Sequence, residues 1–113
     1  MLILAAVAVL LVQNGQASEE EKIAATRSYF DCLFKAAEDL DDGISDATSV
    51  ARAIAPGCLS KLQAVGDVYG RGSNSNVRSI VARRFEEEQY GRATQVVLAV
   101  RKARRERAVS PSS

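Results

Sequence analysis

Hydrophobic residues recur at helical spacing in three segments of this chain. In residues 18 to 40 they fall at steps of three and four residues, as one buried face of an α-helix requires; they are Ile23, Phe30, Leu33, Phe34, Ala37 and Leu40. Ser18 and Glu21 match a capping box, so the helix is predicted to begin there. Gly43 is suited to a left-handed turn that ends it.

A second helix is predicted from Ser45 to about residue 65. Its inner face comprises Ala47, Val50, Ala51, Ile54, Cys58, Leu62 and Val65. Pro56 lies inside this segment and cannot donate to the carbonyl of Arg52, yet the apolar period continues beyond it. We therefore expect a kink at Pro56 and not the end of the helix.

A third helix is predicted from residue 77 to residue 107. It follows a glycine- and serine-rich stretch, residues 66 to 76, which predicts a flexible loop. Glu88 and Arg92 are spaced for an ion pair, and Gly91 is the place where a bend is expected. Residues 109 to 113 have no period and are predicted to be disordered. The apolar stripe of this helix is Ile80, Val81, Phe85, Ala93, Val96, Val100 and Ala103.

The first 12 residues are all apolar, which is too short for a spanning helix of about 20 residues but typical of a signal peptide. Gly15 and Ala17 are the small residues that signal peptidase requires before its cut. We therefore predict a signal peptide over residues 1 to 17 and a periplasmic or secreted protein. Only the terminal amine supplies positive charge before the apolar run. The alternative is a short apolar helix that docks on the rest of the protein or on a membrane surface.

Removing 17 of the 113 residues leaves 96, enough for one small domain over residues 18 to 108. With no Trp and only three Phe and three Tyr, the core must consist mainly of Ala, Val, Leu and Ile, which favours closely packed helices. The net charge of +1 excludes a strong bulk attraction to nucleic acid. The charge is nevertheless uneven: residues 18 to 60 hold nine acids and four bases, and residues 61 to 113 hold five acids and eleven bases. This polarity suits antiparallel packing, self-association or a charged partner.

Cys32 and Cys58 lie on consecutive predicted helices, on either side of Gly43. In an exported protein, two such cysteines predict a structural disulfide. Closing a loop of this length stabilises the fold by roughly 3.5 kcal/mol in the chain-entropy model. The predicted fold class is therefore all-α: a disulfide-linked helical hairpin plus a long third helix, resembling a three-helix bundle.

A reversible thiol pair is the alternative function of the two cysteines. The chain has neither a Cys-x-x-Cys motif nor any His to lower a thiol pKa. The same absence of His, with only two cysteines, argues against zinc. It also leaves no partner for a serine nucleophile, so we expect no catalytic residue, metal or cofactor.

Two further motifs are weak. Asp39, Asp41, Asp42 and Asp46 cluster at the first turn, but no Glu stands where an EF-hand needs its bidentate ligand, so a solvated pair of helix ends is the preferred interpretation. Gly66, Gly70 and Gly72 do not have the spacing of a phosphate-binding loop, and no Lys precedes Ser73.

The strongest candidate surface is a basic segment of five cations near the carboxyl end of the third helix: Arg101, Lys102, Arg104, Arg105 and Arg107. Basic residues there offset the negative end of the helix dipole, although five exceed that role. An anionic lipid surface, an acidic protein or a nucleic acid could attract them. The segment lacks aromatic residues that stack on bases, which argues against sequence-specific nucleic-acid binding.

Residues 25 to 58 carry a set of short elements: Tyr29 with Cys32, Leu40-Asp-Asp-Gly43, Ser45-Asp-Ala47, Val50-Ala51, Ile54-Ala55 and Cys58. This set resembles small, uncharacterised secreted helical proteins of bacteria, with no named family attached. The resemblance implies export, a bacterial envelope setting and a disulfide-linked hairpin. It brings no catalytic residue with it and does not cover the basic third helix.

The sequence therefore predicts a non-catalytic binding or structural component of the cell envelope. Its expected partner is a protein or an anionic envelope surface, and a homodimer is a further possibility because a long third helix exposes more apolar surface than a hairpin covers. The alternatives are a small thiol/disulfide redox protein and an electrostatic binder of anionic membrane or nucleic acid through the basic helix.

Overall fold

Helices make up most of residues 15 to 109, which are the residues that this computed structural model describes. They are α2 (Glu19–Leu40), α3 (Ala47–Ile54), a 3-10 turn η1 (Ala55–Cys58), α4 (Leu59–Gly70), α5 (Ser75–Glu87) and α6 (Gln89–Val109). No strand occurs within this range, so the all-α prediction is confirmed. The apolar part of the predicted signal peptide and residues 110 to 113 lie outside the described residues.

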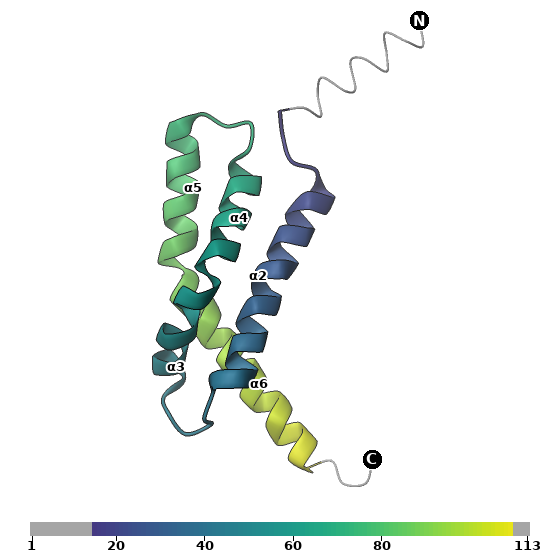
Figure 1. Ribbon diagram of the computed structural model, residues 1–113, viewed down its shortest axis with the longest axis vertical. Helices are drawn as coiled ribbons and strands as arrows, with labels where there is room; N and C mark the ends of the chain where they lie inside the picture. The colour runs from purple at the N-terminus through teal and green to yellow at the C-terminus, as the bar shows by residue number, and fades with distance from the viewer. Residues whose placement is uncertain (1–14, 110–113) are drawn as a thin grey trace, which may run out of the picture.

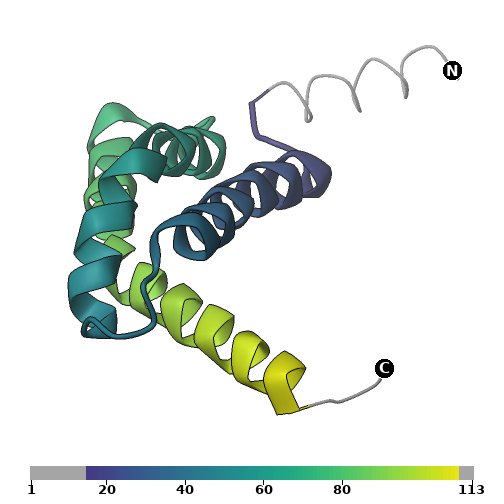
Figure 2. The same ribbon diagram turned by 60° about the horizontal axis from the view of Figure 1, so that its bottom comes forward.

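The helices form three arms, as the hydrophobic pattern predicts (Figure 1). The first arm is α2, the second is α3, η1 and α4, and the third is α5 with α6. Helix α4 lies between α2 and α5, and α3 packs on α6. Figure 2 shows α6 as a separate rod that contacts α2 and α3. Helix α5 contacts only α4 and α6 among the described elements.

The capping box at the start of α2 is confirmed. The Glu21 amide donates to Ser18 Oγ at 3.1 Å, and the Ser18 amide donates to Glu21 Oε1 at 3.4 Å. Such reciprocal bonds satisfy amides that a helix start leaves without partners.

The buried face of α2 is rotated from the predicted one. Tyr29, Leu33 and Ala37, each one turn apart, are buried. The prediction was right for Leu33 and Ala37 but wrong for three positions, because Ile23, Phe34 and Leu40 are 54%, 38% and 64% exposed. Tyr29, which the prediction did not include, is buried in the core, whereas Phe30, which it did include, is half-buried.

The second arm confirms the prediction almost residue for residue. Six of the seven predicted inner residues are buried, and Ala47 is half-buried. Pro56 produces η1, a short 3-10 segment, after which α4 continues the same apolar face. The expected kink is therefore present.

The predicted loop over residues 66 to 76 was wrong in its first half. Helix α4 continues to Gly70, and the glycines are buried where α5 packs against it. A Cβ atom on Gly66 would lie 3.9 Å from the Cα of Ala82 and 3.9 Å from the Phe85 ring. Gly70 serves a close helix contact, because a Cβ atom there would lie 2.9 Å from Arg78 Cγ, whereas Gly66 leaves room for a methyl group. Gly72, with φ of +85°, makes the actual turn.

The third arm breaks at Glu88, three residues before the expected bend at Gly91. Helix α5 has no buried residue, and Ile80, predicted to face the core, is 60% exposed. Helix α6 supplies the core through Ala93, Val96 and Val100, as predicted, and through Val97, which the predicted stripe did not include. It also extends to Val109, one residue into the predicted tail.

The predicted disulfide joins Cys32 on α2 to Cys58 at the end of η1, with 5.9 Å between the two Cα atoms. Cys58 is 1% exposed and belongs to the hydrophobic core, while Cys32 is half-buried against it. Within residues 15 to 109, no helix is both long and apolar enough to cross a membrane.

Candidate functional site

Two of the five cations in the basic segment fold back onto the end of α2. Arg101 Nη2 lies 2.8 Å from Asp41 Oδ1, and Arg104 Nη1 lies 3.2 Å from Asp41 Oδ2. The Asp41 side chain is completely buried between them. Arg104 also donates to the Glu38 carbonyl at 2.7 Å, and Arg101 donates to the Ser45 carbonyl. We call this group of Asp41, Arg101 and Arg104 the arginine clamp.

The arginine clamp corrects the interpretation of the acidic turn as a purely solvated pair of helix ends. The hydrogen bond from Arg101 lowers the pKa of Asp41, with Arg104 adding to the attraction and burial opposing it. Asp42 is exposed, as predicted, but it accepts bonds from the Ser45 hydroxyl and from the amides of Ser45 and Ile44, which lower its pKa to about 2. The turn is therefore held by ionised carboxylates.

The rest of the basic segment faces solvent. Lys102, Arg105 and Arg107 are exposed. The structure thus divides the predicted anionic-partner site into two internal cations and three that remain available to a partner. The described residues contain no group of three or more His, Cys, Asp or Glu arranged to hold a metal ion.

An apolar hollow between the helices was not predicted from the sequence. It has a volume of about 220 Å³ and lies where α2, α4, α5 and α6 meet. Its walls include four of the six aromatic residues of the chain, three Phe and three Tyr in all; these four are Tyr29, Phe30, Tyr69 and Phe85. The other lining residues are Thr26, Leu62, Val65 and Arg92. We call these eight residues the aromatic pocket.

Cations lie against the rings of the aromatic pocket. The Arg92 guanidinium carbon is 5.9 Å from the centre of the Tyr29 ring and 5.5 Å from that of Phe85. Lys22 Nζ is 5.6 Å from the centre of the Tyr69 ring. These distances are those of cation–π contacts. Arg92 also donates to the Phe85 carbonyl at 2.6 Å and to Glu88 at 3.0 Å, which confirms the predicted Glu88–Arg92 pair.

Two hydroxyl groups of pocket residues have no hydrogen-bond partner. They are the Tyr29 phenol and Thr26 Oγ1, both closed off from solvent. A buried hydroxyl without a partner costs about 1 to 3 kcal/mol relative to a satisfied one. Such groups call for a specific explanation.

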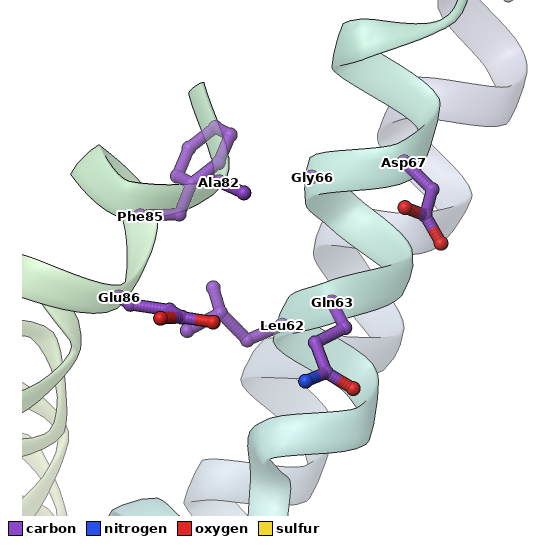
Figure 3. Close-up of a pocket in the computed structure, with 7 residues that line it drawn as sticks. All are labelled: Leu62, Gln63, Gly66, Asp67, Ala82, Phe85 and Glu86. Atoms are coloured by element: carbon purple, nitrogen blue, oxygen red, sulfur yellow. The ribbon is translucent and has the colours of Figure 1, made fainter. Parts of the chain in front are cut away.

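A second, smaller hollow of about 60 Å³ separates α4 from α5 (Figure 3). Leu62, Gln63, Gly66 and Asp67 line it from α4, and Ala82, Phe85 and Glu86 line it from α5. Leu62 and Phe85 line both hollows, so the two are adjacent. The packing of α5 on the rest of the molecule is therefore loose near the aromatic pocket.

No signal in the hydrophobic period could locate the aromatic pocket, because its residues come from four helices. The scarcity of aromatic residues is the one useful signal, since most of them gather at this place. No protein-family model, curated protein or solved structure matches this chain.

Proposed function

We propose that this protein is an exported, non-catalytic binding component of the bacterial cell envelope, working in the periplasm or outside the cell. The observation that carries the proposal is the Cys32–Cys58 disulfide, whose Cys58 end is buried in the core. A disulfide in that position suits a protein that folds in an oxidising compartment and keeps the bond as a permanent cross-link. The aromatic pocket supports a binding role.

The redox alternative is less well supported. A catalytic disulfide needs one sulfur that a thiolate partner can attack and a site that lowers the thiol pKa. Cys58 is 1% exposed, and the chain has no His.

The electrostatic alternative also loses part of its basis. Arg101 and Arg104 are engaged by Asp41 within the same chain. Binding to an anionic surface would therefore depend on Lys102, Arg105 and Arg107.

Export is tested by changing the residue before the proposed cleavage site. In a bacterial host, Ala17→Leu should prevent processing, because signal peptidase requires a small residue directly before the cut. The matched control is Gln16→Leu, since signal peptidase tolerates a larger residue at the second position before the cut. We expect the mature protein in the periplasmic or culture fraction for the parent and for Gln16→Leu, and uncleaved precursor for Ala17→Leu. The proposal would be contradicted if all three proteins were processed equally, or if none of the three were processed.

A further inference from the structure

We propose that the aromatic pocket binds a small free amphiphile with an apolar body and a carboxylate head. This inference rests on the proposed binding function and names its ligand class. Three properties of the pocket carry it: its walls, its charge and its size.

The walls specify an apolar body. The hollow of about 220 Å³ lies beside the core, opens to the surface and is lined mainly by apolar side chains. Four aromatic rings surround it in a chain whose core is otherwise mainly aliphatic. Apolar clefts with a few convergent polar groups are typical of small-molecule sites.

The charge specifies an anionic head. Arg92 stands over the rings of Tyr29 and Phe85, and Lys22 stands over the ring of Tyr69. Arg92 lines the pocket and would repel a cationic ligand, whereas Lys22 does not line it and pairs with Glu19 at 3.2 Å. A carboxylate would instead be attracted and could accept charge-assisted hydrogen bonds from Arg92.

The present partner of Arg92 can be exchanged. Glu88 is 53% exposed, whereas the Arg92 side chain is 23% exposed. A pair with one solvated member is weak, so a ligand carboxylate can take the place of Glu88 while water solvates the released side chain. The unpartnered Thr26 and Tyr29 hydroxyls are closed off from solvent in the free protein, so the ligand carboxylate accepts from them only once they turn toward the pocket.

The size specifies a short ligand. Pockets that enclose drug-sized molecules have about 300 to 1,000 Å³. At about 220 Å³ this one is smaller, so a medium-chain carboxylate suits it and a diacyl lipid does not.

The test compares three probes with the same eight-carbon chain: octanoate, octanol and octylamine. Each is titrated into the ¹⁵N-labelled protein, and amide chemical shifts are followed by NMR. We expect octanoate to shift the amides of pocket residues most strongly, octanol to bind at least about tenfold more weakly, and octylamine to give no saturable shift there. Equal binding of all three, or no saturable shift with octanoate, would overturn the inference.

Two variants separate the pocket from general charge effects. Arg92→Gln removes the cation at the rings and should weaken octanoate binding at least about tenfold, which is about 1.4 kcal/mol. Arg84→Gln is the matched control, because Arg84 also pairs with Glu88, at 3.6 Å, but does not line the pocket. It should leave octanoate affinity within about twofold of the parent. Equal weakening by both variants would count against a specific head-group site.

A third variant keeps the test decisive if Arg92→Gln does not fold. Thr26→Val keeps the shape of the side chain and removes one unpartnered hydroxyl. The free protein should be as stable as the parent or more so, and octanoate affinity should fall by about threefold or more. Unchanged affinity would overturn the role of that hydroxyl. If octanoate fails to bind while Ala17→Leu still blocks processing, the inference fails and the proposed export stands.

Discussion

Asp41 joins the carboxyl end of α2 to helix α6 through one buried carboxylate. It follows the last residue of α2 directly and receives Arg101 and Arg104 from the second half of α6. A buried carboxylate is tolerated only when its charge is compensated, and here two guanidinium groups share that role.

Asp41→Asn should therefore destabilise the protein by about 2 kcal/mol in urea unfolding. Breaking a fully buried ion pair typically costs about 3 to 5 kcal/mol. The loss here should be smaller, because the Arg101 and Arg104 side chains remain 17% and 35% exposed. Asp39→Asn is the matched control, since Asp39 is exposed on the same helix end. Identical midpoints for the two variants would show that the arginine clamp contributes nothing.

Acid should weaken the fold through the same turn. The pKa values of Asp41 and Asp42 are lowered in the folded protein, Asp42 to about 2, so both bind protons less readily than in the unfolded chain. Their contribution is complete above the ordinary value of 3.8 and is lost as pH falls toward 2.

Thermal unfolding measured from pH 5 to pH 2 should show this loss in the parent protein. The double variant Asp41→Asn, Asp42→Asn should lose less stability over the same range. Some slope should remain in the double variant, because Arg71 also lowers the pKa of Glu21. The same decline in both proteins would contradict the assignment.

At the scale of elements, the contact between α4 and α5 depends on small residues. Gly66 faces Ala82, and Gly70 faces Arg78, one helical turn away on each helix. A Cβ atom on Gly70 would lie 2.9 Å from Arg78 Cγ, so this end of the contact is the tighter one.

Gly66→Ala should stabilise the protein by up to about 1 kcal/mol. The added methyl would make ordinary contacts at 3.9 Å, and alanine has the higher helix propensity. Gly91→Ala, where nothing lies within 4 Å, measures the propensity gain alone. Gly66→Leu should instead lower the denaturation midpoint by displacing α5. A loss of stability with Gly66→Ala would contradict the 3.9 Å clearance between Gly66 and α5.

The helical period was enough to predict the arms but not how they pack. It identified the core face of the second arm correctly, because that arm is covered by neighbours over its whole length. It failed for Ile80 on α5, since a helix with so few neighbours leaves its apolar stripe in solvent. The sequence predicts Gly66 and Gly70 as loop residues, because glycine favours turns and close helix contacts alike.

The candidate site was less predictable from the sequence than the packing of the helices. The arginine clamp joins residues 60 positions apart, and the aromatic pocket draws on four helices. Neither the charge of Arg101 nor the spacing of the aromatic residues reveals such contacts before the arms are placed. The disulfide was predictable because the hairpin itself brings Cys32 and Cys58 together.

For the molecule as a whole, the disulfide should be the largest single contribution to stability. Replacing both Cys32 and Cys58 by alanine should cost about 3.5 kcal/mol in the chain-entropy model, more than the loss of Asp41. Urea unfolding of the double variant provides the measurement. A cost below about 1 kcal/mol would mean that helix packing alone specifies the fold.

The central claim is that the protein is exported and permanently cross-linked. Its most direct test is the intact mass of the protein from the envelope or culture fraction of its host, before and after alkylation without reductant. We predict a chain that begins at Ser18 and gains no alkyl group. A full-length cytosolic species that gains two alkyl groups would contradict both the proposed compartment and the closed disulfide.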